Sequence, residues 1–331
     1  MLLPPLRSAK GICTPNRLGS ANAVAAGAMA WNGGAVVELS TGTGGESRGR
    51  RVTLWVLAFL VMAAAVVYQR RTGPTYPARG SVSIAGKTLD FRLLRSQVTT
   101  AEAPVELAAP VGVDGTLRWR RLRSDDEWQR VPMRREGEVL RATLPIQPPA
   151  GKVEYLLELA AADGSATVPP DGRPVVLRYR GDVPAWLLVP HILCMFLGLL
   201  VAVRAGLAAI AAPAGVTRLS RLALGGMTLG GMILGPMVQK HAFGAYWTGW
   251  PLGQDLTDDK TLWMWLAWVV AVLVLGRGAG ETRPSRRLVV ALSMAVSLAV
   301  YMVPHSARGS ELDYHKLEQG VSATDAIHTG R

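Results

Sequence analysis

The chain has 331 residues, of which 49% are hydrophobic and only 18% are charged, and its formal net charge is +12. This composition excludes a disordered chain and a collagen-like fibre, and two cysteines, Cys13 and Cys194, are too few for a disulfide scaffold. The apolar residues gather in long uncharged runs, which indicates a membrane protein.

Five runs contain no Asp, Glu, Lys or Arg: 52–68, 183–203, 222–238, 262–276 and 288–304. A helix needs roughly 17 to 20 apolar residues to cross the hydrocarbon core of a bilayer, and four of the runs reach that length. The run 262–276 is shorter, but the tryptophans at its start can lie in the membrane interface and extend it. Backbone groups need internal hydrogen bonds in lipid, so we expect about five transmembrane helices.

Basic residues predict how these helices are oriented. Segments 204–221 and 277–287 have an excess of arginine, whereas segment 239–261 and the tail 305–331 have an excess of acid. The positive-inside rule therefore predicts that the N-terminus lies in the cytoplasm and the C-terminus outside. Arg70 and Arg71, outside after the first run, depart locally from this rule.

The predicted organisation has five parts. Residues 1–51 are rich in Gly, Ala and Ser and are expected to be a disordered tail or to precede the true start. Run 52–68 is expected to be an anchor helix, although Ala63-Ala64-Ala65 also fits the cleavage site of a signal peptide. Segment 75–182 should form an outer β domain, 183–304 a four-helix bundle, and 305–331 an outer tail.

The outer segment has the pattern of a small all-β fold. Gly, Pro and Asp interrupt it at intervals of about eight to twelve residues, which is typical of a β-sandwich. Short alternating runs occur at 80–84, 88–94, 104–108, 115–122, 139–144, 153–159 and 175–179. That number of strands predicts an immunoglobulin-like sandwich.

Part of this segment has a more specific pattern. The residues that carry it are Trp128, Val131-Pro132-Met133, Gly137, Leu140, Ala142, Leu144-Pro145, Gln147-Pro148, Gly151, Val153, Tyr155 and Ala162-Asp163-Gly164. The pattern resembles the immunoglobulin or fibronectin type III-like modules of bacterial surface and carbohydrate-active proteins. The resemblance covers roughly 116–165 and implies a sandwich fold and a docking role, although a fold does not determine a function. The segment differs from antibody domains because it has no cysteine pair.

Arginines and acids alternate in the same segment. The arginines are Arg118, Arg120, Arg121, Arg123, Arg130, Arg134 and Arg135, and the acids among them include Asp125, Asp126, Glu127, Glu136 and Glu138. Such mixed charge is typical of a solvated surface, and contact with anionic lipid headgroups is the alternative. The expected partners are the lipid bilayer and a membrane or periplasmic protein, whereas nucleic acid is not expected outside the cytoplasm.

The histidines are the main candidate site. All five, His191, His241, His305, His315 and His328, lie in the outer part of the predicted bundle or in the tail. His191, His241 and His305 belong to three different helices or their ends. Neutral imidazole is a good ligand for zinc, copper and iron, so these three residues are candidate ligands of a metal or of haem.

Sulfur atoms accompany two of these histidines. Cys194 and Met195 lie on the helical face of His191, and Met237 lies four residues before His241. Sulfur together with imidazole suits copper, or haem b with an axial histidine. The alternative is that Cys194 and Met237 only pack between helices, and that His191 binds a backbone carbonyl that Pro190 leaves free.

The outer segment 239–261 contains a second candidate site. Asp255, Asp258 and Asp259 offer carboxylate oxygens for Ca²⁺ or for a proton path. The simpler alternative is that Thr257 or Asp258 caps the helix that follows.

Glycines predict the central helix. Gly226 and Gly230, and then Gly231 and Gly235, have the small-xxx-small spacing that lets helices approach closely. These spacings favour the third run as the centre of the bundle, with a kink at Gly235-Pro236.

Two functions follow from these patterns. The first is a bacterial inner-membrane protein with a periplasmic immunoglobulin-like module, which acts as a non-catalytic accessory or docking component. The second is a membrane redox or metal-handling protein that binds haem b or copper. A transporter fits poorly because the apolar runs carry no charged side chain.

Overall fold

The computed structural model describes residues 47–211, 214–276, 283–304 and 309–329, which belong to one compact unit. Residues 1–46 of the predicted N-terminal tail (1–51) and the candidate ligand His305 lie outside the described residues. Residues 48–51, the end of that predicted tail, are helical and begin the first helix.

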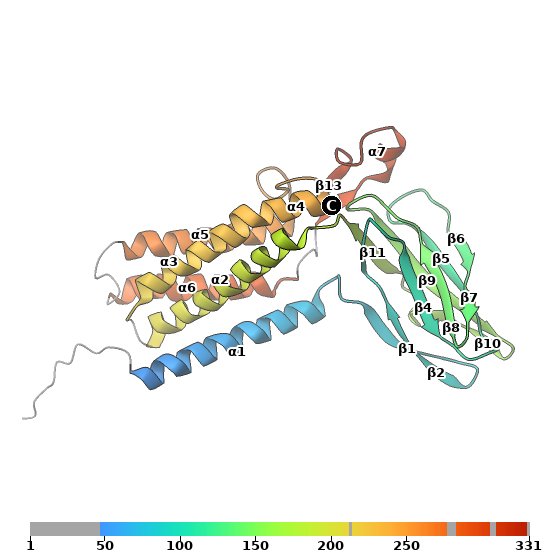
Figure 1. Ribbon diagram of the computed structural model, residues 1–331, viewed down its shortest axis with the longest axis horizontal. Coiled ribbons are helices and arrows are strands. Elements are labelled where there is room, and N and C mark those ends of the chain that lie inside the picture. The colour runs from blue at the N-terminus through green and yellow to red at the C-terminus, as the bar shows by residue number, and fades with distance from the viewer. Residues whose placement is uncertain (1–46, 212–213, 277–282, 305–308, 330–331) are drawn as a thin grey trace, which may run out of the picture. The chain divides into compact units, whose positions relative to one another are not determined.

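All five apolar runs are helical. The helices are α1 (Arg48–Thr72), α2 (Ala185–Ala211), α3 (Val216–Met227), the π-helix η1 (Thr228–Leu234), α4 (Gly235–Phe243), α5 (Leu256–Leu275) and α6 (Pro284–Met302). Figure 1 shows them side by side, and we call them the helix bundle. Among the described residues, four helices are long and apolar enough to cross a membrane: α1, α2, the continuous run Val216–Phe243 and α6.

The helix α5 differs because Asp258 and Asp259 in its first turn, followed by Lys260, shorten its apolar part. It is nevertheless an integral part of the bundle, where Trp268 is fully buried and donates a hydrogen bond of 2.9 Å to Ser297 Oγ of α6. The last turn of α5 lies beside the start of α3, since Arg221 donates to the Gly276 carbonyl at 2.8 Å.

The central helix of the bundle is α2, which contacts α1, α3, η1, α4 and α6. The expectation that the third run is central is therefore wrong. The close approach depends on glycines of both partners, because a Cβ added to Gly226 would lie only 2.9 Å from Cα of Gly198. Arg204, expected in a loop, lies inside α2, is 2% exposed and stacks on Trp55 at 5.7 Å.

The kink expected at Gly235-Pro236 takes the form of the π-helix η1. Pro236 has no N–H to donate to an α-helical ladder. Just before it, the Gly235 N–H reaches back to the Gly230 carbonyl, which is the wider hydrogen-bond step of a π-helix.

Residues 78–180 form the β region. Its strands are β1 (Ala78–Ile84), β2 (Lys87–Leu93), β3 (Ser96–Val98), β4 (Ala103–Ala108), β5 (Asp114–Arg121), β6 (Gln129–Pro132), β7 (Arg134–Glu136), β8 (Val139–Leu144), β9 (Lys152–Ala161), β10 (Gly164–Val168) and β11 (Val175–Arg180). All seven expected strands are present, and β3, β6, β7 and β10 are additional.

The strands form three open sheets. One has the order β3-β11-β9-β5-β6 with β10 beside β9, the second has β4-β8-β7, and the third is the β1-β2 hairpin. The pairing of β3 with β11 is parallel, whereas the other pairs are antiparallel. Alternate residues of all three sheets contribute to one apolar core, with Phe91, Leu107 and Leu157 among them.

A short link joins the β region to the bundle. Residues 181–184 connect β11 directly to α2. The Gly181 N–H donates a hydrogen bond of 2.8 Å to the Ala242 carbonyl at the end of α4. A side chain at Gly181 would collide with the backbone of His241, so glycine is needed at this close approach.

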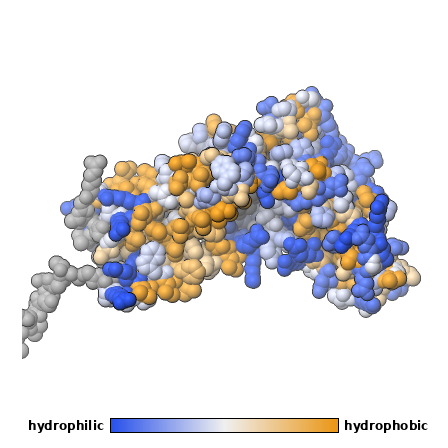
Figure 2. Space-filling model, viewed as in Figure 1, coloured by the Kyte–Doolittle hydropathy of each residue, from blue (hydrophilic) through white to orange (hydrophobic). Residues whose placement is uncertain are grey.

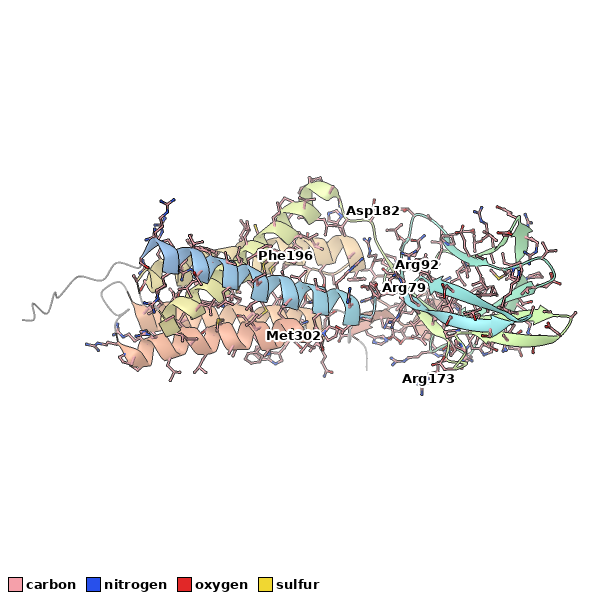
Figure 3. All side chains as sticks on the ribbon, turned by 90° about the horizontal axis from the view of Figure 1, so that it is seen from below. Arg79, Arg92, Arg173, Asp182, Phe196 and Met302 are labelled. Carbon is pink, nitrogen blue, oxygen red and sulfur yellow. The ribbon has the colours of Figure 1, made fainter. Side chains whose placement is uncertain are left out.

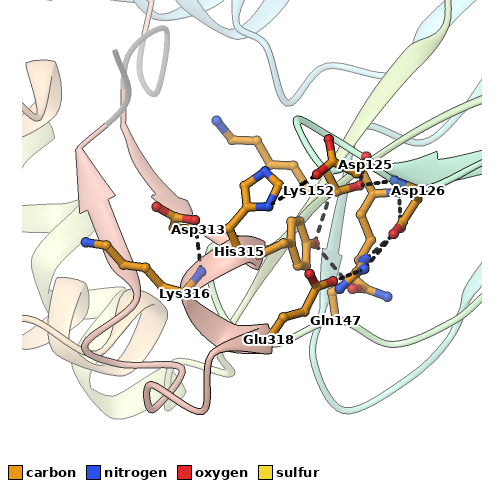
Figure 4. Close-up of polar contacts among 11 residues, drawn as sticks. Asp125, Asp126, Gln147, Lys152, Asp313, His315, Lys316 and Glu318 are labelled. Atoms are coloured by element: carbon orange, nitrogen blue, oxygen red, sulfur yellow. Dashed lines mark hydrogen bonds and ion pairs between the residues drawn. The ribbon is translucent and has the colours of Figure 1, made fainter.

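The C-terminal segment, residues 309–329, is not a free tail. It contains β12 (Ser310–Leu312), α7 (Tyr314–Glu318) and β13 (Ile327–Thr329), and it packs against the β region (Figure 4). The hydroxyl of Tyr314, which is 2% exposed, donates to Gln147 Oε1 at 3.2 Å and to the Lys152 carbonyl at 3.1 Å. The ion pair between Lys152 and Glu311, at 2.6 Å, is also largely buried.

Figure 2 shows how the surface divides between these parts. Hydrophobic residues cover the visible face of the helix bundle, whereas hydrophilic residues dominate over the β region. This division is expected of helices that face lipid and of a β region that faces water.

Candidate functional site

A cavity of about 340 Å³ lies where the helix bundle meets β11, and we call it the junction cavity. Its apolar wall comes mainly from α2 and α4. The side chains of its polar wall come from α1, β11, α2, α4, the start of α5 and the end of α6. The apolar wall includes Leu188, Ile192, Met195, Phe196 and Val238; the polar side chains include Gln69, Arg178, His191, Gln239, Asp255, Asp258 and Tyr301.

His191 is held in one orientation by η1. Its Nδ1 lies 2.9 Å from the Gly230 carbonyl oxygen, which only accepts hydrogen bonds, so the proton of the neutral ring is on Nδ1. The lone pair of Nε2 then remains as the acceptor of the ring. The carbonyl that His191 binds belongs to η1 and not to the turn that Pro190 disrupts, which corrects the alternative drawn from the sequence.

Asp255 caps α5 and joins it to the C-terminal segment. Its Oδ1 accepts from the Thr257 N–H at 2.8 Å, and its Oδ2 accepts from the N–H of Ser310 at 3.0 Å and from the Ser310 hydroxyl at 3.2 Å. The carboxylate is 2% exposed. Asp255 is therefore the cap that the sequence assigned to Thr257 or Asp258.

Asp258 holds the loop between α4 and α5. Its Oδ2 accepts from the N–H groups of Thr248 at 2.7 Å and Gly249 at 3.1 Å, and from Gln239 Nε2 at 3.0 Å. Burial raises the pKa of Asp258 to about 6, since removal from water disfavours the charged form, and the hydrogen bonds from Thr248 partly oppose this shift. Asp258 precedes the apolar part of α5, at the polar wall of the junction cavity.

Asp259 turns away from this cluster. Its Oδ1 accepts from the Trp250 N–H at 2.6 Å, so it fastens the other side of the same loop. It does not line the junction cavity. The three aspartates therefore act on one loop, but only Asp255 and Asp258 border the cavity.

Arg178 supplies a positive charge to the polar wall. It is 8% exposed, donates to the Ser310 carbonyl at 2.7 Å and stacks over Phe243 at 4.2 Å. Burial lowers the pKa of Arg178, while the charges of Asp255 and Glu311 oppose that shift. The polar wall thus combines an arginine with acidic side chains.

The remaining histidines lie elsewhere. His241 is exposed on α4, His315 of α7 faces Asp125 at 3.7 Å, and His328 belongs to β13. Within the described part of the chain, no group of three or more His, Cys, Asp or Glu side chains could hold a metal ion. Of the described histidines, only His191 lines the junction cavity.

The predicted sulfur ligands are used for packing. A Cβ at Gly230 would lie 2.9 Å from the Cβ of Cys194, so Cys194 fills the contact between α2 and η1. Met237 packs against the apolar cluster that contains Val183 and Leu187. Met195 is the sulfur-bearing residue that lines the cavity beside His191.

The sequence did not identify Arg178, Gln239 or Tyr301 as site residues. A weak signal existed for Arg178, because it is a charged residue within the apolar strand β11. It lies, however, on the face opposite the core residues Val175, Leu177 and Tyr179, where an arginine is ordinarily solvated. Gln239 and Tyr301 gave no such signal, since they reach the cavity only through the packing of α4 and α6.

The junction cavity has the features of a binding site for a small molecule. It combines an apolar wall with a few convergent polar groups, one of them an acid with a raised pKa. Comparison with protein-family models gives no match, and comparison with curated proteins gives none either.

Proposed function

We propose that this chain is a bacterial inner-membrane protein that binds a small amphipathic molecule in the junction cavity. We further propose that it acts as an accessory component and not as an enzyme. The observation that carries this proposal is the two-sided lining of the cavity, with apolar side chains of α2 and α4 facing Arg178, Asp255 and Asp258. A molecule with an apolar body and a polar head would match both walls.

The proposed topology has five spans, with the β region outside. Two observations support α5 as the fifth span. It is packed within the bundle, and its ends lie at opposite ends of the bundle, near Thr248 and near Arg221. The contacts between the C-terminal segment and the β region support placing both on the same side of the membrane. The basic residues Arg286 and Arg287 at the other end favour that end as cytoplasmic.

We also propose an immunoglobulin-like sandwich for the β region and docking of a membrane or periplasmic protein to it. The single core shared by the three sheets supports a sandwich. In this proposal the β region captures the partner and the junction cavity holds the small molecule.

A pair of substitutions on one helical run tests the cavity. Val238→Trp would fill the junction cavity, whereas Ile233→Trp adds the same side chain at an exposed position outside it. Wild-type protein and both variants are extracted in mild detergent, and the small molecules that co-purify are identified by mass spectrometry. We expect a bound molecule in wild type and in Ile233→Trp and its loss in Val238→Trp. Equal retention by Val238→Trp, or an empty wild-type protein, contradicts the proposal.

The second candidate function is binding of haem b or copper. The orientation of His191 favours it, because a backbone carbonyl at Nδ1 leaves Nε2 free to act as a ligand. An absorption spectrum and elemental analysis of the purified protein test this function. A Soret band or stoichiometric copper that disappears in His191→Ala would support it, and a colourless, metal-free, folded protein would exclude it.

A further inference from the structure

A second cavity of about 420 Å³ lies where the end of α1 meets β1, β2, β3 and β11, and we call it the basic cavity. Six arginines line it, Arg70, Arg79, Arg92, Arg95, Arg178 and Arg180, and none of the described residues in its lining is acidic. Among the cavities of the molecule it therefore stands out by charge and not by size.

Strand pairing brings these arginines together from distant parts of the sequence. Arg79 and Arg92 are directly opposite each other in the β1-β2 hairpin, and Figure 3 shows both near the end of α1. Arg178 and Arg180 are alternate residues of β11 and so share one face. The Arg178 N–H donates to the Arg95 carbonyl at 3.1 Å, which places Arg95 beside them.

Such an arrangement is unfavourable without a counter-charge. Like charges directly opposite each other in an antiparallel pair destabilise that pair. Burial lowers the pKa of Arg95 and of Arg178, which means that their charges are held against a desolvation cost. Nε of Arg178 is buried and has no hydrogen-bond partner among the described residues.

The other arginines of the β region show the contrast. Arg118, Arg120, Arg121, Arg123, Arg130 and Arg141 each form an ion pair with a glutamate or an aspartate. None of the ion pairs among the described residues involves the six arginines of the basic cavity. Asp255 and Glu311 act on Arg178, but neither lines this cavity. Arg134 and Arg135 of the mixed surface also have no ion pair among the described residues. The contrast is that six arginines of that surface have an acidic partner, whereas none of the six in the basic cavity has an ion pair with any described residue.

The position of the cavity relates it to the membrane surface. Arg70 follows the apolar run 52–68 by two residues, and Arg79 stacks over Tyr76 at 5.3 Å. Tyrosine and arginine at the end of a span are typical of the headgroup layer. An anion bound at this depth would also explain why Arg70 and Arg71 depart from the positive-inside rule.

We propose that the basic cavity binds the phosphate oxyanion of a lipid headgroup or of free phosphate. The planar guanidinium fork donates two parallel hydrogen bonds to phosphate oxygens, and several forks from different strands suit one multivalent anion. This proposal does not depend on the ligand of the junction cavity, although Arg178 and Phe243 belong to the walls of both cavities.

The experiment uses the full chain in mild detergent. Binding of inorganic phosphate and of dioctanoyl phosphatidylglycerol is measured by calorimetry and by the shift in Tm. The test variant is Arg79→Gln/Arg92→Gln, since both side chains are exposed at the mouth of the cavity. The matched control is Arg134→Gln/Arg173→Gln, which removes the same charge from exposed positions outside the cavity. We expect the test variant to raise the Kd for the phosphate ligand at least about tenfold and the control to leave that Kd unchanged.

The two probes distinguish the source of the phosphate. Phosphatidylglycerol that binds at least tenfold more tightly than inorganic phosphate indicates a lipid headgroup, and comparable binding indicates free phosphate. In buffer without phosphate or phospholipid, the test variant should have an equal or higher Tm than wild type, because it removes the repulsion between Arg79 and Arg92. The absence of binding to wild type, or equal binding by test and control variants, overturns the proposal.

Discussion

Two contacts hold the C-terminal segment, one to the helix bundle and one to the β region, and they differ in how far their charged groups are removed from water. At the junction, Asp255 is 2% exposed and its carboxylate accepts from backbone and side-chain donors of Thr257 and Ser310. On the outer face of α7, Arg121 pairs with Glu318, whose side chain is 54% exposed. Both contacts use a carboxylate, but only the first is removed from water.

This difference in burial determines how much each contact contributes to the free energy of folding. A buried acceptor with several donors is costly to remove, because each donor loses its partner away from water. An exposed ion pair exchanges one solvated state for another and contributes about 0–1 kcal/mol. The junction should therefore dominate the stability of the contact, and the substitutions below test that order from the largest expected effect to the smallest.

Asp255→Ala should have the largest effect. It removes the cap of α5, leaves the donors of Ser310 without an acceptor and takes a counter-charge from Arg178. We expect a loss of about 3–5 kcal/mol in the free energy of unfolding, measured by chemical denaturation in detergent. Asp325→Ala, at an exposed position of the C-terminal segment, is the control. A similarly small loss in both variants would show that the buried carboxylate of Asp255 contributes no more to stability than an exposed one.

The pH dependence of Asp258 should come next. Its pKa in the folded protein is raised from 3.8 to about 6, so its stabilising contribution is complete below 3.8 and is lost as pH rises through 6. Relative to Asp258→Asn, wild type should lose up to about 3 kcal/mol between about pH 4 and pH 6.5. Thermal unfolding of both proteins across this range measures the difference. A difference that stays constant with pH would show that the pKa is not raised.

Tyr314→Phe should have a smaller effect, because it removes one hydroxyl from the buried side of the C-terminal segment. The hydroxyl donates to Gln147 and to the Lys152 carbonyl, and the ring remains in place. We expect a loss of about 1–2 kcal/mol, measured by the same denaturation. A loss as large as that of Asp255→Ala would mean that the two contacts are equally important.

Glu318→Gln should have the smallest effect. It removes the charge that pairs with Arg121, but Asp126 also binds that arginine at 2.5 Å. We expect a loss of less than about 1 kcal/mol, and it should disappear in 1 M salt because exposed pairs are screened. A larger or salt-independent loss would indicate that this pair is buried in solution.

The sequence predicted the local structure well. The five uncharged runs became helices and the seven alternating runs became strands, because apolar length and alternation depend on neighbouring residues only. The parallel pairing of Ser96 with Arg178 and the docking of Tyr314 on Gln147 could not be read in this way. Such contacts depend on tertiary packing between residues far apart in the chain.

The candidate site was predicted in part. His191, Asp255 and Asp258 do line one cavity, whereas His241 lies on the exposed side of α4 and Cys194 fills a helix contact. Helical spacing indicates which residues share a face but not which face meets the cavity. The six arginines of the basic cavity were missed for a related reason, since only the strand register reveals that Arg79 faces Arg92.

The short link after β11 has a mechanical consequence. Because Gly181 is bonded to the end of α4 and its chain continues directly into α2, a force on the β region loads two helices together. A displacement of the β region is therefore transmitted to both helices, through the chain to α2 and through this backbone hydrogen bond to α4. Substitution of Gly181 would push the end of α4 away, so that displacements of the β region would reach α2 alone.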